Sequence, residues 1–162
     1  MRWQPVILAS LLIITRTLTS AADCDANREP FADKEFVILK STPSFKEATQ
    51  SAARAAATLG VGLNLRGLSP NLKTGLTFSR EECTRSEFRY PCYVPRGRRD
   101  DGTYVSVEWS SEYELFAKGL YVVMIASDVP GSSKTRRILE TARRTYPDAY
   151  AKRVKVYVGC MH

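Results

Sequence analysis

The sequence is poor in the groups that most often catalyse reactions or bind metals. It contains one histidine, and this is the last residue, His162. No Ser-His-Asp or Cys-His arrangement can be built from it, and no two cysteines have the CxxC spacing of a zinc site. The glycine pattern of a phosphate-binding loop is absent upstream of "SSKT". We therefore predict no metal and no cofactor.

Carboxylates are present, but they do not form a recognisable catalytic pair. A glycoside hydrolase needs two acids held across a cleft. The neighbouring acids of this chain fall in expected loops and strand ends, at Glu81 and Glu82, Asp100 and Asp101, and Glu112 and Glu114. The sequence therefore predicts a protein that is not an enzyme.

Only one long apolar run occurs, and it stands near the start of the chain. Arg2 precedes the apolar residues Val6 to Ile14, and small residues follow as far as Ala22. This pattern is typical of a secretory signal peptide, here residues 1–22, with Ala21 as the other plausible cleavage position. The run is shorter than a membrane-spanning helix, so stable membrane insertion is not expected.

The remaining residues, 23–162, are expected to form one domain of a periplasmic or secreted protein. A lipoprotein signal needs a small residue before its cysteine, whereas Asp23 precedes Cys24. The formal charge of +7 includes Arg2 and Arg16 of the signal segment, which holds no acid, so the mature chain carries +5. This modest positive net charge favours anionic partners. Nucleic acid is not an expected partner, because the chain is expected to be exported.

The mature chain contains two similar strand–helix–strand patterns. In the first, an apolar strand from Phe36 to Lys40 leads into a helix that Thr42 or Ser44 caps and Gly60 ends. The alternating "VGLNLRGL" is then expected to be a strand. In the second, "GLYVVMIAS" and "RVKVYVG" are the strands, and "SSKTRRILETARR" lies in the helix between them.

An irregular insertion at about 69–118 separates the two units. It is rich in proline, glycine and charge, and it ends in the clear strand "YVSVEWS". The order of the expected elements is strand–helix–strand, then the insertion, then strand–helix–strand. It predicts an α+β fold, namely a ferredoxin-like two-fold βαβ sandwich in which an antiparallel sheet carries two helices on one face. Its expected core includes Phe45, Leu59, Val107, Ile138 and Val156.

Four cysteines in an exported chain predict two disulfides. In the expected topology the first and last strands are antiparallel neighbours, which brings Cys24 close to Cys160. Cys83 and Cys92 are close in sequence within the insertion. We therefore predict the pairs Cys24–Cys160 and Cys83–Cys92.

Two segments resemble a SPOR domain, the bacterial module that binds peptidoglycan. They are "EFVILKST" with "SFKEATQSAARAA", and "LYVVMIAS" with "KTRRILETARRTYPDAYAKRVKVYVG". The resemblance covers about 34–68 and 119–159 and leaves out the insertion. It implies a non-enzymatic module of the bacterial envelope that binds glycan strands on an open sheet face.

The sheet face opposite the helices is the expected binding surface, because its central strands are apolar on both faces. The polar and aromatic residues expected around it are Asn64, Arg66, Tyr104, Ser106, Glu108, Lys155 and Tyr157. Such residues suit carbohydrate or protein recognition. Alternatively, the insertion covers this face and completes a second small core.

A second hypothesis places the function in the insertion loop. "RGRRDDG" carries Arg96, Arg98 and Arg99 beside two aspartates, and such a loop either contacts an anionic partner or neutralises its own charge. The protein would then be a small disulfide-stabilised inhibitor or immunity-like protein that blocks an exported cell-wall-active enzyme. A structural subunit without a ligand is the third possibility.

Overall fold

The computed structural model describes residues 29–98 and 100–159. The expected signal peptide, Cys24, Arg99 and Cys160 lie outside these described residues. The elements, in chain order, are β1 (Phe31–Thr42), α1 (Phe45–Leu59), β2 (Ser69–Asn71), β3 (Gly75–Thr77), α2 (Arg80–Arg85), β4 (Thr103–Trp109), the 3-10 turn η1 (Ser110–Glu112), β5 (Tyr121–Asp128), α3 (Ser133–Arg143) and β6 (Tyr150–Tyr157).

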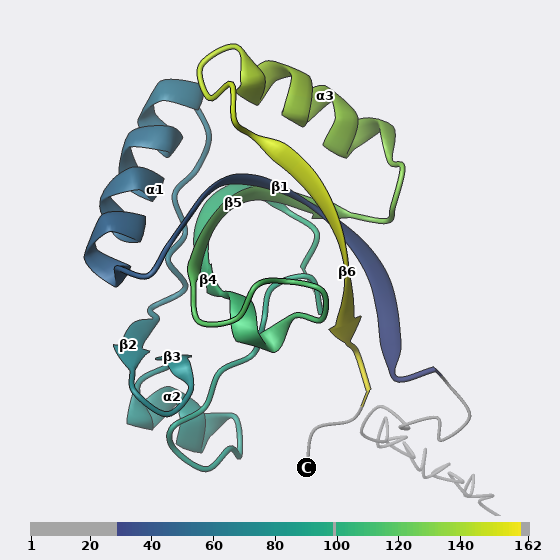
Figure 1. Cartoon of the computed structure of the whole chain (residues 1–162). Helices are drawn as coiled ribbons and strands as arrows, with labels where there is room; N and C mark the ends of the chain where they lie inside the picture. The colour runs from purple at the N-terminus through teal and green to yellow at the C-terminus, as the bar shows by residue number, and fades with distance from the viewer. Residues whose placement is uncertain (1–28, 99, 160–162) are drawn as a thin grey trace, which may run out of the picture.

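A four-stranded antiparallel sheet forms the centre of the molecule. Its strand order is β4-β5-β1-β6, so the first and last strands are neighbours, as expected. The sheet curls strongly, and α1 and α3 lie on its outer face (Figure 1). The α+β class predicted from the sequence is therefore confirmed. The strands β2 and β3 form a separate hairpin.

Helix α1 begins and ends where its capping residues predict. The Ser44 hydroxyl accepts a hydrogen bond from the Glu47 amide at 3.3 Å. Gly60 ends the helix with a φ of 65°, a conformation that glycine adopts at little cost. Small buried residues, Ala48, Ala52, Ala55 and Ala56, line the face that packs on the sheet.

The expected strand in "VGLNLRGL" is not formed. The Asn64 side chain accepts a hydrogen bond from the Arg66 amide at 2.8 Å, which makes a local turn. Arg66 and Gly67 both have positive φ, so the backbone cannot continue as a strand. Only an isolated bridge from Leu63 to Val105 remains. The second strand of the first unit is therefore β4, and the insertion precedes it.

One hydrophobic core lies between the sheet and the two long helices. Val37, Val105, Val107, Val123 and Ile125 supply the sheet side of this core. Of the predicted core residues, Val107 is buried, whereas Phe45, Leu59 and Ile138 are partly buried at its margin.

A second core fills the opposite face of the sheet, so the expected open face does not exist. Phe36, Ile38 and Met124 project from the sheet there and have no exposed surface. Tyr113 and Phe116, from the segment that follows β4, pack against them inside the curve of the sheet. The 3-10 turn η1 leads into this segment and lies between the two edge strands of the curled sheet, β4 and β6 (Figure 1). Covering this face removes an apolar surface that would otherwise contact water.

The second core also reverses the faces on which the sequence placed Val156 and Tyr157 of β6. Val154 and Val156 are buried, but they belong to the core opposite the helices. Because side chains alternate along a strand, Lys155 and Tyr157 then lie on the other side of β6. The prediction that Tyr157 points away from the helices was therefore wrong.

The insertion forms a small lobe that a disulfide closes. Cys83 and Cys92 are bonded, as predicted, and both are buried. The Cys92 amide donates to the Thr77 hydroxyl at 3.1 Å, and the Phe78 amide donates to the Cys92 carbonyl at 2.9 Å. The hairpin, α2 and the disulfide therefore form one unit below the sheet in Figure 1.

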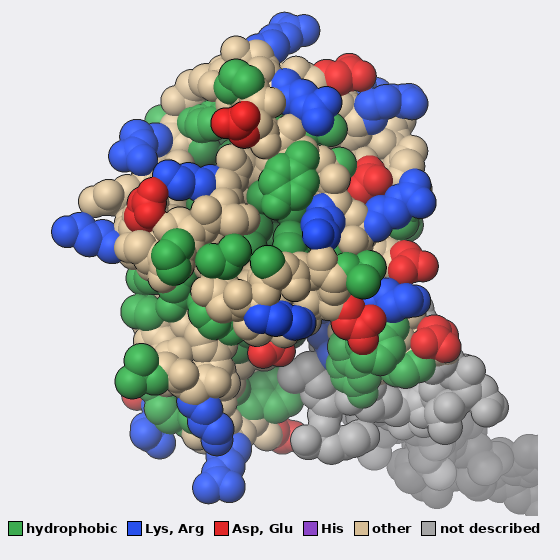
Figure 2. Space-filling model, viewed as in Figure 1, with side chains coloured by type: hydrophobic (Ala, Val, Ile, Leu, Met, Phe, Trp, Pro, Cys, Tyr) green, Lys and Arg blue, Asp and Glu red, His purple; other side chains and the backbone are tan. Residues whose placement is uncertain are grey.

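The surface mixes charges of both signs. On the face drawn in Figure 2, basic and acidic side chains of the described residues alternate and do not gather into one patch. No helix in the described part of the chain is long and apolar enough to cross a membrane.

Candidate ligand-binding pocket

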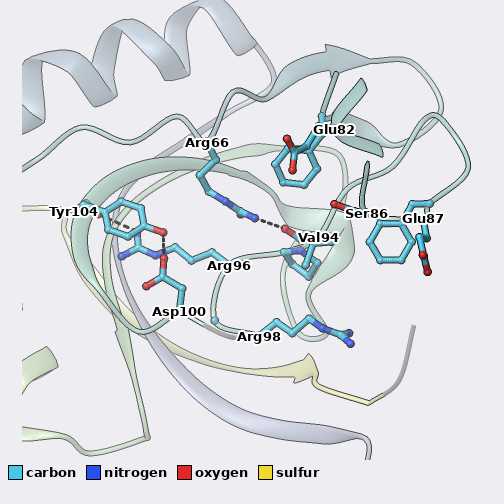
Figure 3. A pocket seen from close by; sticks show the side chains of 13 residues that line it. Arg66, Glu82, Ser86, Glu87, Val94, Arg96, Arg98, Asp100 and Tyr104 are labelled. Carbon is cyan, nitrogen blue, oxygen red and sulfur yellow. Dashed lines mark hydrogen bonds between the residues drawn. The ribbon is translucent and has the colours of Figure 1, made fainter. Parts of the chain in front are cut away.

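A pocket of about 660 Å³ lies between the disulfide lobe and residues 94–98 and 100 (Figure 3). Its size is within the range of small-molecule sites. Its lining combines three aromatic rings with six charged side chains: Phe78, Phe88 and Tyr104, and Arg66, Arg96, Arg98, Glu82, Glu87 and Asp100. Polar groups therefore face apolar rings across one hollow.

The lobe side of the pocket is held by the structure around Cys83. Ser79 caps α2, where its hydroxyl accepts a hydrogen bond from the Glu82 amide at 3.1 Å. The Phe88 amide donates to the Cys83 carbonyl at 2.8 Å. Phe78 and Phe88 are thus placed by backbone bonds to the disulfide unit, and their rings are half-buried.

Arg66 joins the lobe to the sheet. Its guanidinium donates to the Val94 carbonyl at 2.6 Å and to the Glu108 carboxylate at 2.8 Å. The guanidinium also lies 5.6 Å from the centre of the Phe78 ring. Burial alone would lower the pKa of Arg66, but the negative charge of Glu108 outweighs it and the net pKa is raised.

Glu108 lies beneath the pocket and is fully buried. Besides Arg66, its carboxylate accepts a hydrogen bond from the Tyr93 hydroxyl at 2.6 Å. Tyr113 lies 3.5 Å away on another side. Burial, followed by the charge of Glu108, raises the pKa of both tyrosines well above 10. Glu108 therefore orients Arg66 and is not itself a surface residue, contrary to the prediction.

Arg96 is also buried, with 1% of its surface exposed, so it cannot be the exposed loop arginine that the sequence suggested. Its guanidinium donates to the carbonyls of Gly102 and Tyr104 at 2.6 and 2.9 Å. These carbonyls lie where the pairing of β4 with β5 is interrupted between Thr103 and Ser106. Arg96 thus satisfies backbone acceptors that the sheet leaves unpaired.

Tyr104 and Asp100 form the end of the pocket next to β4. The Tyr104 hydroxyl donates to the Asp100 carboxylate, and the Arg96 guanidinium lies 3.7 Å from the ring centre. Burial and this hydrogen bond raise the pKa of Tyr104 to about 12. Burial opposes ionisation of Asp100, but the Tyr104 and Gly102 donors outweigh it and lower its pKa. The pair therefore presents an anion at neutral pH.

Arg98 lines the pocket and reaches the end of β6. It donates to the carbonyls of Tyr157 and Gly159, and its guanidinium lies 5.4 Å from the Tyr157 ring. The predicted loop group is thus divided: Arg96 lines the pocket as a buried residue that holds the backbone, Arg98 lines it from the loop, and Arg99 is not described.

The predicted sheet-face group is divided as well. Arg66 and Tyr104 line the pocket, and Glu108 supports it from below. Ser106 is buried and accepts a hydrogen bond from Arg96, while Asn64 makes the turn before Arg66. Lys155 and Tyr157 lie on β6, outside the lining, with Lys155 paired to Asp33 at 3.6 Å.

Sequence reasoning missed the lobe residues of the site. Phe78 and Phe88 stand five residues before and five after Cys83, in "FSREECTRSEF". Phe88 lies inside the short loop that Cys83 and Cys92 close, and Phe78 lies just before it. Aromatic residues within and beside a predicted disulfide loop were the available signal. Glu82 and Glu87 accompany them.

Comparisons with known proteins give no further information. The chain matches no family model, no curated protein and no solved structure. Within the described residues, no group of three or more histidine, cysteine or acidic side chains could hold a metal ion.

Proposed function

We propose that this protein is an exported, non-enzymatic binding module that recognises a glycan strand of the peptidoglycan type in the pocket of Figure 3. The location differs from the open sheet face that the SPOR resemblance implies. The partner is a saccharide of the cell envelope, and the protein acts in the periplasm or outside the cell.

The composition of the pocket carries this proposal. A sugar ring has an apolar C–H face that stacks on aromatic rings, and Phe78, Phe88 and Tyr104 offer such rings. Its hydroxyl rim needs planar groups that donate or accept two hydrogen bonds, which Arg98 and Asp100 provide. The volume of about 660 Å³ has room for more than one sugar unit. The arginines also suit the carboxylates that peptidoglycan carries.

The arrangement of the sheet supports a SPOR-like, ferredoxin-like origin for the scaffold. The two strand–helix–strand units, β1-α1-β4 and β5-α3-β6, pair in the order β4-β5-β1-β6 with both helices on one face. The part of the insertion between α1 and β4 adds the lobe side of the pocket, and the segment after β4 covers the inner face with Tyr113 and Phe116. We infer that a binding surface of the scaffold has moved from the sheet to the edge of this insertion.

Co-sedimentation with purified sacculi tests the proposal. Phe88→Ala removes a half-buried ring of the lobe and should weaken binding about tenfold or more, since aromatic anchors dominate binding sites. Tyr150→Ala removes an aromatic side chain that is 38% exposed on β6, away from the pocket, and should bind like the parent. Failure of the parent protein to sediment with sacculi would reject the glycan function, as would equal losses in both variants.

A second candidate is the inhibitor or immunity-like function, and one observation favours it. Leu72, at the tip of the β2–β3 hairpin, is completely exposed, beside a lobe that a disulfide holds together. A rigid loop with an apolar tip is suited to enter the cleft of an exported enzyme.

Turbidity assays of sacculi with a muramidase distinguish the two candidates. If the protein is an inhibitor of such enzymes, it slows clearing, Leu72→Asp abolishes the effect, and Phe88→Ala preserves it. If it binds glycan, any protection of the sacculi depends on Phe88 and not on Leu72.

A further inference from the structure

A second, smaller pocket lies on the helix side of the sheet, between α1 and α3. Its volume is about 150 Å³. Ile125 of β5 and Ala142 of α3 are buried at its base, and Leu59, Val61 and Ile138 form partly buried apolar walls. It lies beside the end of α1 at Gly60, and Ala142 contributes only a small side chain to its lining.

The size of this pocket limits what can occupy it. An apolar cavity of about 150 Å³ accepts one benzene ring. The pocket therefore has room for a single ring or a branched alkyl group and is too small for a disaccharide. It is also separate from the glycan pocket, with which it shares no lining residue.

The rim of the pocket is polar and cationic. Arg137 is exposed at the rim and forms no salt bridge with any residue that the structure describes. Thr103 and Thr141 place two exposed hydroxyl groups at the same rim. No acidic side chain lines the pocket, and α3 carries one lysine and three arginines against a single glutamate. An anionic group at the rim would meet a positive charge and two hydrogen-bond donors.

We propose that the pocket between α1 and α3 binds small carboxylic acids that carry one ring or one branched alkyl group. The apolar group occupies the space above Ile125 and Ala142. The carboxylate lies at the rim, where the Arg137 guanidinium binds it and Thr141 or Thr103 donates a further hydrogen bond. This site is independent of the proposed glycan function.

Titration of the ¹⁵N-labelled mature protein by NMR tests this inference, with phenylacetate as the probe. Amide shifts should be confined to the end of α1, Thr103, Ile125 and 137–142, with a dissociation constant of about 1 mM for so small a ligand. Phenethylammonium, which has a similar shape and the opposite charge, should bind at least about fivefold more weakly. Equal binding of the two ions would overturn the proposal. So would amide shifts elsewhere, or no shifts at a phenylacetate concentration of about 20 mM, which is 20-fold the expected dissociation constant.

Three variants separate charge from shape. Arg137→Gln should weaken phenylacetate about five- to tenfold and leave neutral benzyl alcohol unchanged. Arg136→Gln removes the same charge from the adjacent, solvent-facing position and should change neither ligand. Thr141→Phe places a ring over the mouth from an exposed position and should abolish binding of both. A loss of phenylacetate binding in Arg136→Gln equal to that in Arg137→Gln would show a general charge effect and reject the site.

Discussion

At the scale of single residues, the molecule depends on charged side chains that its own fold removes from water. Arg66, Arg96 and Glu108 look like surface residues in the sequence, and in the structure Arg96 and Glu108 are buried. Hydrogen bonds to Glu108 Oε2 and from the two terminal nitrogens of Arg96 replace most of those with water, whereas Glu108 Oε1 and Arg96 Nε are buried without a partner among the described residues. These contacts link the lobe, the sheet and the pocket, so the site and the stability of the protein share residues.

The pair of Arg66 and Glu108 gives the first prediction. Arg66→Met removes the cation and leaves a buried carboxylate, which should lower the free energy of unfolding by about 3 kcal/mol. Adding Glu108→Gln removes the uncompensated charge and should restore part of this loss. Urea denaturation of the parent, both single variants and the double variant measures the coupling. Strictly additive losses would show that the two side chains do not act as a pair.

The buried tyrosines predict a loss of stability in alkaline solution. The raised pKa values of Tyr93 and Tyr113 keep them protonated in the folded state, while an unfolded tyrosine ionises near pH 10. The unfolded state therefore binds fewer protons above pH 10. The contribution of the two tyrosines to the free energy of unfolding is complete below pH 10. It is lost as the pH rises further, by at most about 1.4 kcal/mol per pH unit for each tyrosine.

Urea denaturation between pH 9 and 11 checks this dependence. Above pH 10, Tyr93→Phe should make the free energy of unfolding fall less steeply with pH, because one of the two buried tyrosines no longer contributes. Tyr150→Phe, which changes an exposed ring, should leave this slope unchanged. An unchanged slope in Tyr93→Phe would contradict the assigned cause.

At the scale of elements, local patterns predicted the two long helices and the four strands of the central sheet, but not the hairpin β2–β3 or α2, which lie in the segment expected to be irregular. The cap at Ser44, the glycine at the end of α1 and the alternation of β4 are signals that act within a few residues. They failed at "VGLNLRGL", where alternation suggests a strand but the Asn64 side chain favours a turn. In such segments, competition between side-chain hydrogen bonds and strand pairing decides whether a turn or a strand forms.

The face that each strand presents was harder to predict than the strand itself. Both faces of this sheet are packed, so the valines of β6 could serve either core. The second core comes from Tyr113 and Phe116, which lie in a segment without periodicity. Nothing local to that segment indicates which surface it covers, and the pocket depends on the same long-range packing.

The turn at Gly97 connects the pocket to the second core and gives a prediction of its own. A Cβ atom there would lie 2.7 Å from the buried Phe36 ring, and its φ is +89°. Gly131 has a similar φ of +78° with no atom within 4 Å, so it is a matched control. Gly131→Ala should cost about 1–2 kcal/mol from the backbone alone, and Gly97→Ala about 1–3 kcal/mol more from the clash.

Chemical denaturation of these two variants measures the difference. Equal losses would mean that the loop moves away from Phe36 without cost, and that the second core does not fix the position of Arg98 in the pocket.

At the scale of the whole molecule, one curled sheet organises two cores and two pockets. The helix core carries the small apolar pocket at its margin. The segment before β4 supplies the lobe side of the large pocket, and the segment after β4 covers the second core. The chain begins and ends on neighbouring strands, with Phe31 opposite Tyr157. Both ends of the described chain therefore leave the sheet at the same end of this strand pair.

A disulfide between Cys24 and Cys160 would close that region, and it remains a prediction because both residues lie outside the described part of the chain. The pairing extends to the last described residues, since the amides of Val158 and Gly159 donate to the Pro30 carbonyl at 2.7 and 3.2 Å. Cys160 follows Gly159 directly, and Cys24 precedes Pro30 by six residues, a distance that an extended chain spans easily. Cys83 and Cys92 are bonded to each other, which leaves this pair.

Peptide mapping of the purified protein under non-reducing conditions should yield one fragment that joins Cys24 to Cys160. Closing so long a loop should stabilise the fold by about 5 kcal/mol in the chain-entropy model, so the double variant Cys24→Ser with Cys160→Ser should unfold at clearly lower urea concentrations. The double variant Cys83→Ser with Cys92→Ser is the control, with an expected loss of about 3 kcal/mol because its loop is short. Free thiols at Cys24 and Cys160, or a link from either to the lobe, would contradict both the pairing and the neighbourhood of the chain ends on which it rests.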